Sequence, residues 1–404
     1  MPFATVKLHH LWASRIIAMG HVAGFSAVNG VHGKYADTYG FGNAPAGTNA
    51  LAAYHTAMDI ALSEAFQVSF YAERRRLLAR LSNSENKTLG IEWGKRVGQR
   101  MVQMRAKDGS DPTKVNYYTG SYRPTNHIGS WEPTLPNFTA GTGPQVPSYH
   151  RPLFPSMGDI DPWIMGDKKL FRAPAFWDFR SKSFADEYAE VKELGSAHSR
   201  TRTADQTEIA LFWEDGPRGA TPPGHWLIIA MQLCQGRFSI YELARIMALA
   251  SIAQADAAIT AWDSKYHYDI LRPETAIRYR AHKLGNRDPR VKGQTGWTSL
   301  INTPPFPAYT SGHSCFSGAG ARAIALALGT DRVKFTRFPT DLVNWPQLCG
   351  VTRNFSSIWQ AAEENGQSRI YGGVHWQIDN RIALYVGSKL ADHAFANAFQ
   401  RRFG

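Results

Sequence analysis

Cysteine is scarce in this 404-residue chain, and its scarcity excludes two common kinds of stabilising site. The three cysteines are Cys234, Cys315 and Cys349, an odd number with no CxxC spacing and no Cys/His cluster. Such a pattern does not support a disulfide framework or a structural zinc site. Stability must therefore come from a hydrophobic core, for which 43% hydrophobic residues are ample.

Long apolar runs and a leader pattern are also missing. No uninterrupted apolar run approaches the ~20 residues that cross a bilayer, so we expect no membrane span. The residues after Met1 lack the charged and apolar regions of a signal peptide. We therefore expect a cytoplasmic protein, or a secreted or periplasmic one if an export segment has been removed.

Positive charge is abundant but not concentrated. The formal net charge is +12, yet the basic residues are scattered along the chain. The densest group, Arg74 to Arg76, falls in an amphipathic helical pattern and is typical of a solvated face. There is no RNA-binding signature, zinc finger or Gly-Lys-Ser/Thr phosphate loop, so we expect no nucleic-acid partner.

Helical periodicity dominates, and strand patterns are almost absent. This predicts an all-α fold of two helical bundles with little or no β structure. We expect one helical domain over 1–404, with an N-terminal bundle to about 107 and a C-terminal bundle over 183–404. The expected helices are 8–30, 51–66, 71–81, 85–107, 184–194, 204–213, 224–234, 240–262, 313–328, 356–369 and 375–396, and residues 266–270 either continue the 240–262 helix or restart it.

The excursion between the bundles, 108–182, has a different composition. Up to about residue 177 it is rich in Pro, Gly, Tyr, Trp and Asn, and it is too long for an ordinary connection. Its aromatic residues argue against disorder. We interpret it as ordered chain that covers a site or forms the subunit contact of a homo-oligomer, and the sequence does not choose between them.

Three segments of the C-terminal half carry groups that suit an oxyanion. In the first, Lys265 and Arg272 are seven residues apart, which on a helix places them on one face about 10 Å apart. In the second, Ser311-Gly312-His313 opens a helix, where free backbone N–H groups favour an anion. Each motif alone has an ordinary alternative, such as a solvated basic face.

The third segment runs from Ser368 to Asp379. Arg369 offers a planar fork that suits an oxyanion. His375 and Asp379 lie four residues apart, so the carboxylate can orient the imidazole. Together, the three segments predict a cationic cage with one ligand or nucleophile and one acid–base histidine.

These motifs resemble a known superfamily. Lys-x6-Arg-Pro, Ser-Gly-His and Ser-Arg-x5-His-x3-Asp are similar to the three-part signature of vanadium-dependent haloperoxidases and type 2 acid phosphatases. Phe306, preceding Ser-Gly-His, and Trp262, preceding Lys265, resemble the chloroperoxidase type. The chain has Thr310 where the usual motif has proline, which affects loop stiffness rather than chemistry.

The resemblance implies roles for individual residues. His375 is implied as the axial vanadium ligand, His313 as the acid–base group, and Lys265 as a further catalytic group beside peroxide. The expected vanadate-binding residues are Lys265, Arg272, Ser311, Gly312, Arg369 and His375. Trp262 and Phe306 are expected to border the halide pocket, with Asp379 and, from spacing alone, Asp205 as supporting carboxylates.

The implied activity is oxidation of halide by hydrogen peroxide to hypohalous acid, followed by halogenation of a small organic acceptor. Bromide is the expected halide, with chloride or iodide as alternatives, and vanadate is the expected cofactor without haem or flavin. Phosphate is also a tetrahedral oxyanion, so a phosphatase with His375 as nucleophile is an alternative. A non-catalytic anion-binding scaffold is a second alternative.

Overall fold

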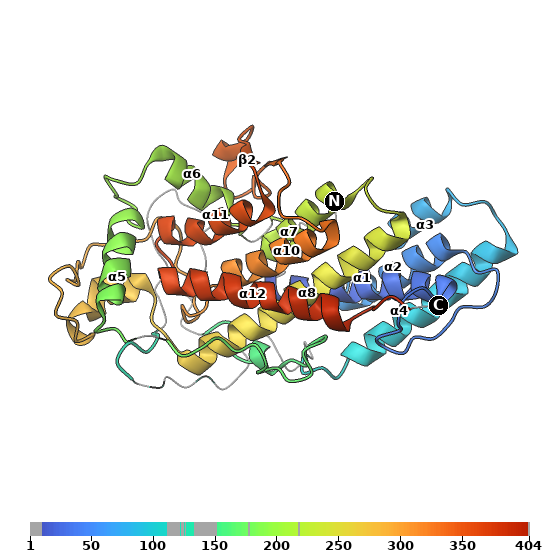
Figure 1. The fold of residues 1–404 in the computed structure, drawn as a ribbon, viewed down its shortest axis with the longest axis horizontal. Coiled ribbons are helices and arrows are strands. Elements are labelled where there is room, and N and C mark those ends of the chain that lie inside the picture. The colour runs from blue at the N-terminus through green and yellow to red at the C-terminus, as the bar shows by residue number, and fades with distance from the viewer. Residues whose placement is uncertain are drawn as a thin grey trace.

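The structure is a computed structural model that describes residues 10–110, 122, 125, 127–132, 152–176, 178–216 and 219–402. This part is predominantly helical and elongated (Figure 1). Its longer helices are α1 (His10–His32), α2 (Ala50–Phe66), α3 (Tyr71–Leu78), α4 (Glu85–Arg105), α5 (Lys182–Leu194), α6 (Ala204–Phe212), α7 (Thr221–Cys234), α8 (Ile240–Tyr268), α10 (Gly312–Leu328), α11 (Ile358–Tyr371) and α12 (Gln377–Asn397). The predicted all-α fold is therefore confirmed.

Helices α1, α2 and α4 pack together at one end of the molecule (Figure 1). The contact between α2 and α4 depends on three glycines spaced four residues apart, Gly90, Gly94 and Gly98. A Cβ atom at Gly90 would lie 2.5 Å from the backbone oxygen of Asn49, and one at Gly94 equally close to that of Ala53. The glycines thus let two helix backbones approach each other more closely than larger residues would allow.

The long helix α8 runs through the molecule and contacts α1, α7, α10 and α12. Ser239 and Glu242 form a capping box at its start, and Asp269 ends it in a left-handed conformation with φ 54°. The sequence predicted a break or a continuation after Trp262, and the helix continues to Tyr268. Lys265 therefore sits in the last turn of a continuous, almost fully buried helix.

Helices α1 and α8 are long and apolar enough to cross a membrane, by length and composition alone. In this structure 78% of the apolar window of α1 and 89% of that of α8 is buried inside the protein. Both therefore pack as core helices of the described fold.

Helix α10 lies against α12, again through closely packed glycines. A Cβ at Gly318 of α10 would stand 2.1 Å from the backbone oxygen of Leu384, and one at Gly387 of α12 would stand 2.1 Å from that of Cys315. This contact fixes the start of α10 relative to α12. The two helix ends that carry Ser311 and Asp379 are joined directly, because Ser311 N donates to the Asp379 backbone oxygen at 3.1 Å.

Some short elements were not predicted. A short helix (α9, Pro273–Thr275) and a π-helix (η3, Ala276–Arg280) follow Arg272, and a 3-10 turn covers Ala281–Lys283 where the sequence suggested loop. Strands β1 (Phe335–Arg337) and β2 (Arg353–Phe355) form a small antiparallel pair. Three-residue elements give too few residues for a periodic signal.

The described parts of the 108–177 stretch are fastened to α8. Trp131 N donates to the Asp269 backbone oxygen at 2.8 Å. Farther along, the Asp256 carboxylate accepts from the backbone N–H groups of Trp163 at 2.7 Å and Ile164 at 3.2 Å. Residues 111–121 and 133–151 lie outside the described residues, so the predicted lid or subunit contact stays a prediction there.

Candidate active site

The end of α8, the start of α10 and the turn between α11 and α12 meet in one buried place. Lys265 is completely buried, and its ammonium group donates to the backbone oxygens of Pro307 and Ala308 at 2.9 Å each. Burial lowers the pKa of Lys265 well below its usual value, and the neighbouring Arg272 lowers it further. The proline-rich segment before Ser311 thus holds this side chain by its carbonyl groups.

Arg272 is also fully buried and links the three segments. Its Nε donates to the Phe306 backbone oxygen at 2.8 Å, and its Nη1 donates to the Val374 oxygen at 2.7 Å. Nη1 also lies 3.0 Å from Nε2 of His375. Nη2 is buried without a hydrogen-bond partner among the described residues. The Nε and Nη1 atoms of Arg272 therefore hold the three segments together, whereas Nη2 can donate to an acceptor that enters the site.

Arg369 stands in the last turn of α11 and is 3% exposed. Its Nε and Nη1 atoms are buried without a partner in the described part of the chain. Burial lowers its pKa to about 10, while the negative charges of Glu214 and Asp215 act in the opposite direction. A buried N–H donor without a hydrogen-bond partner costs folding free energy. This arrangement therefore favours binding of an anion that accepts hydrogen bonds from both arginines.

His375 faces the same place and is held in one tautomer. Its Nδ1 lies 2.8 Å from Asp379 Oδ2, which also accepts from the Trp376 N–H at 3.0 Å. Because the carboxylate accepts at Nδ1, the proton sits there and the Nε2 lone pair accepts from Arg272. Burial and then the charge of Arg272 lower the pKa of His375, so the ring is neutral at physiological pH. Nε2 is thus a ligand or nucleophile atom turned toward the cations.

Burial raises the pKa of Asp379 to about 7, and the nearby Lys265 and Arg272 act against that rise. Asp379 lies in the first turn of α12, where its carboxylate also caps the helix. The same side chain therefore begins the helix and orients the imidazole.

Ser311 caps the start of α10. Its Oγ accepts from Ser314 N at 3.3 Å and from Ser314 Oγ at 2.9 Å, so its own O–H is a donor for another acceptor. Gly312 follows in the first turn, and a Cβ there would lie 2.9 Å from the Trp262 ring. Only glycine allows the helix start to pack this closely against the indole.

His313 is partly exposed, and its Nε2 lies 3.0 Å from the backbone oxygen of Glu214. A carbonyl can only accept, so Nε2 carries the proton in this arrangement. Burial lowers the pKa of His313 to about 3, and the charge of Arg369 adds to this effect. The neutral ring is therefore set to take up a proton when negative charge enters the cage.

Trp262 and Phe306 form an apolar wall beside these cations. Their ring centroids are 4.9 Å apart, and both side chains are almost fully buried. The Phe306 ring centre lies 5.1 Å from Lys265 Nζ and 4.9 Å from Arg272 Cζ. Low polarity on this side strengthens the electrostatic effect of the buried charges.

Asp205 does not lie in this arrangement, which corrects the expectation drawn from spacing. Its carboxylate is mostly exposed and pairs with Arg353 at 3.0 Å. Asp205 lies in the first turn of α6, whereas Glu214 and Asp215 follow the C-terminal end of that helix and act on Arg369. The sequence analysis missed Glu214 and Asp215, whose signal consists of two adjacent acids after a helical pattern.

Comparison with known proteins places this geometry in a family context. Residues 245–403 match the family model of the VCPO second helical-bundle domain. The chain has the fold of the vanadium haloperoxidases. The predicted resemblance is thereby confirmed, and the matched segment contains every cage residue from Lys265 to His375.

Two further comparisons agree with this family. The chain is 27% identical over 318 residues to the vanadium chloroperoxidase of Curvularia inaequalis, covering 62% of this chain and 49% of that protein. It therefore spans about half the length of this curated relative. A bacterial vanadium-dependent iodoperoxidase superposes with a TM-score of 0.76 at 23% identity, covering 98% of this chain and 94% of the other. An apo bacterial vanadium-dependent chloroperoxidase gives 0.76 at 18% identity, covering 98% and 95%.

Proposed function

We propose that this protein is a vanadate-dependent haloperoxidase that oxidises halide with hydrogen peroxide. The observation that carries the proposal is the set of buried, unpartnered guanidinium N–H groups on Arg272 and Arg369, facing the same place as Nε2 of His375. A tetrahedral oxyanion supplies the acceptors that these donors lack. The overall reaction is H2O2 + X⁻ + H⁺ giving HOX + H2O.

The residues present fit vanadate. Arg272, Arg369 and the Ser311 hydroxyl would donate to its oxygens together with the Gly312 backbone N–H, and His375 Nε2 would be its protein ligand. When bound, the vanadium centre supplies Lewis acidity that activates peroxide toward the halide. The protein's own contribution is to bind, orient and neutralise the charge of the bound anion.

Lys265 and His313 have separate tasks in this proposal. Lys265 adds positive charge from a fixed position, because two carbonyl groups hold its ammonium group. His313, with its Nε2 proton engaged by Glu214, would accept a proton at Nδ1 and so assist deprotonation of peroxide. Placing an anion in the cage raises the proton affinity of this imidazole and prepares it for that step.

The halide is proposed to meet the apolar wall of Trp262 and Phe306. Both rings lie beside the cations, so a halide there is partly dehydrated and still attracted by charge. We propose bromide as the main substrate, with chloride and iodide as alternatives that the same assay distinguishes.

A phosphatase of the same fold is the second candidate. Phosphate is a tetrahedral oxyanion like vanadate, so its oxygens can accept from the same N–H and O–H groups of the cage. His375 Nε2 would then attack phosphorus, and His313 would protonate the leaving oxygen. A neutral His375 with its proton on Nδ1 suits both activities. Dependence of the activity on vanadate therefore distinguishes the haloperoxidase from the phosphatase.

The test is a paired activity assay on purified protein. Orthovanadate, peroxide and bromide should give steady bromination of a dione indicator, and omission of vanadate should remove it. Hydrolysis of p-nitrophenyl phosphate without vanadate-dependent bromination would favour the phosphatase. Oxyanion binding without either activity would favour an anion-binding scaffold.

A further inference from the structure

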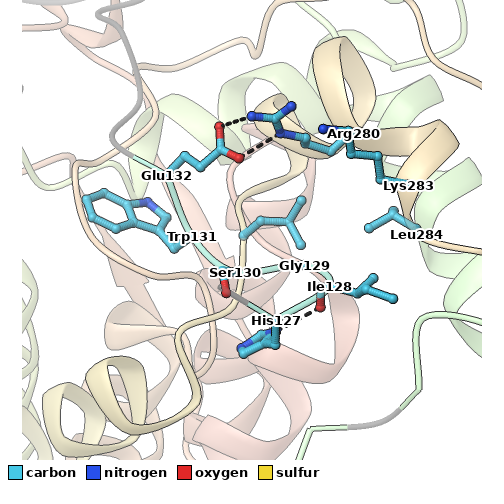
Figure 2. Close-up of a pocket in the computed structure, with 10 residues that line it drawn as sticks. His127, Ile128, Gly129, Ser130, Trp131, Glu132, Arg280, Lys283 and Leu284 are labelled. Atoms are coloured by element: carbon cyan, nitrogen blue, oxygen red, sulfur yellow. Dashed lines mark hydrogen bonds and ion pairs between the residues drawn. The ribbon is translucent and has the colours of Figure 1, made fainter. Parts of the chain in front are cut away.

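A second cavity, of about 500 Å³, is lined in part by Leu271, the residue directly before Arg272 of the cage. One wall is the turn formed by His127 to Glu132, and the other is the π-helix η3 with the 3-10 turn after it. Figure 2 shows Glu132 and Arg280 joined across the cavity, with Trp131 on one side and Lys283 and Leu284 on the other.

The wall formed by 127–132 is fixed to the chain that leads into the cage. Trp131 N donates to the Asp269 oxygen, and Leu271 N donates to the Gly129 oxygen, both at 2.8 Å. Gly129 has φ +83°, and a Cβ there would lie 2.2 Å from the Phe179 ring. Leu271 lines the cavity directly before Arg272. The cavity and the cage therefore share one stretch of backbone.

The opposite wall is equally specific. Arg280 ends a five-residue π-helix, a rare element that recurs at functional sites. Its guanidinium binds the Glu132 carboxylate at 2.6 and 2.7 Å, so this pair closes one side and is electrically neutral. Lys283 beside it is exposed and has no ion pair in the described part of the chain. The cavity thus keeps one uncompensated positive charge.

The remaining surfaces are apolar, with one unused donor. Leu271 and Leu284 are buried, whereas Ile128 is 53% exposed at the mouth. Trp131 is completely buried, and its indole N–H has no hydrogen-bond partner among the described residues. An occupant should therefore have an apolar body, an anionic group near Lys283 and a neutral acceptor oxygen near Trp131.

We propose that this cavity binds a hydroxyaryl carboxylate, which serves as the organic acceptor of the oxidised halide. The carboxylate pairs with Lys283, the ring contacts Ile128, Leu271 and Leu284, and the phenolic oxygen accepts from Trp131. An electron-rich ring is the type that hypohalous acid halogenates, with HOBr + ArH giving ArBr + H2O. The acceptor role rests on the proposed haloperoxidase function, whereas the binding site does not.

Binding can be measured on vanadate-free protein by calorimetry with three probes. They are 4-hydroxyphenylacetate, phenylacetate, which lacks the phenolic oxygen, and 4-methylphenol, which lacks the carboxylate. We expect 4-hydroxyphenylacetate to bind about tenfold more tightly than either analogue, since each lacks one charge-assisted or buried hydrogen bond. Equal affinity of all three, or no saturable binding, would overturn the proposal.

Variants assign the two polar contacts. Lys283→Ala should reduce the affinity for 4-hydroxyphenylacetate to that for 4-methylphenol, while Lys389→Ala, at an exposed position of α12, should leave it unchanged. Trp131→Phe should make the affinities for 4-hydroxyphenylacetate and phenylacetate equal. The ratio of these two affinities is measured on the same protein sample, so it is insensitive to partial loss of folded protein. Equal losses in both lysine variants would contradict a built site.

The acceptor role has its own readout in vanadate-loaded protein. Lys283→Ala should leave bromination of the dione unchanged, because that indicator reports oxidised halide in solution. In a mixture with the dione, the share of brominated 4-hydroxyphenylacetate should fall about tenfold. Probe binding without any bromination would refute the proposed function and keep the binding site, and an unchanged share would refute the acceptor role alone.

Discussion

His375 Nδ1 and Asp379 Oδ2 lie 2.8 Å apart at the start of α12, and both side chains are buried. This contact leaves Nε2 as the nitrogen of the His375 ring whose lone pair faces Arg272 and the cage. It also joins an imidazole to a carboxylate that already caps the helix by accepting from the Trp376 N–H. The ligand atom is therefore positioned by secondary structure rather than by a flexible side chain.

We expect His375→Ala to abolish retention of vanadate, because the variant loses the Nε2 atom that is proposed as its protein ligand. Asp379→Asn should weaken vanadate binding about 10- to 100-fold, the range found when a partner of a metal-binding histidine is replaced. Metal analysis after gel filtration and calorimetric titration measure both effects. Asp392→Asn, on the same helix and paired with Arg322 near the surface, is the matched control.

His313→Ala should keep most of the vanadate affinity and lose peroxide-dependent turnover, since His313 contributes a proton-transfer group rather than a cage donor. A reduction of about 100-fold or more in kcat is expected for a lost acid–base group. Unchanged turnover in the variant would refute the role assigned to His313.

Anion binding should be accompanied by proton uptake at His313. Its pKa is lowered to about 3 by burial and by Arg369, so the ring is neutral between pH 5 and 8 before the anion enters. An anion offsets the cationic charge, raises this pKa and draws a proton from solution. Calorimetry in two buffers of different ionisation enthalpy should show uptake for the wild type and less for His313→Gln. Equal uptake would assign the proton to a carboxylate instead.

Glu214→Gln should change stability in a pH-dependent way. Burial raises the pKa of Glu214 from 4.5 to about 6, so the folded state prefers the protonated carboxyl. That stability is present below about pH 4.5 and is lost as pH rises through 6. The variant should therefore exceed the wild type by about 1–2 kcal/mol at pH 8 and match it near pH 4.5. Urea unfolding at both values, with exposed Glu92→Gln as control, decides this.

His225 should stabilise the loop that presents Glu214 to His313. Its Nδ1 lies 3.1 Å from both carboxylate oxygens of Asp215, which also accepts from Thr340 at 2.7 Å. His225→Phe leaves a buried charge with one fewer partner and should cost about 3 kcal/mol of unfolding free energy. His225→Gln, which keeps an N–H donor, should recover part of it. Turnover should fall more than vanadate affinity, since the loop contacts His313.

Much of the helical framework could be predicted from local sequence. The apolar periodicity and the caps at Ser239, Ser311 and Asp269 act within a few residues, so the bounds of α8 and α10 came close to those observed. The chain positions of Lys265, Arg272, Arg369 and His375 likewise followed from motif spacing. Their convergence was a hypothesis at that point, since nothing local connects segments about a hundred residues apart.

Asp205 illustrates the limit of spacing. Thr203 and Gln206 form a capping box at the start of α6, which makes Asp205 a first-turn residue facing Arg353. Glu214 and Asp215, nine and ten residues later, reach the cage instead because the helix ends there. Packing against other segments determines which end of a helix faces the site. A short sequence motif does not contain this information.

The sequence by itself determined the helical class, the helix ends and the set of cationic and imidazole groups, because periodicity and capping are local interactions. Only the tertiary structure decided which nitrogen of each histidine carries its proton, which carbonyls hold Lys265 and Arg272, and which arginine N–H groups remain without a partner. These properties arise from contacts between distant segments in a buried setting, where a displacement of one ångström makes or removes a hydrogen bond. The second cavity is likewise a property of the tertiary structure, since its two walls come from segments that are distant in sequence and meet only in the folded protein.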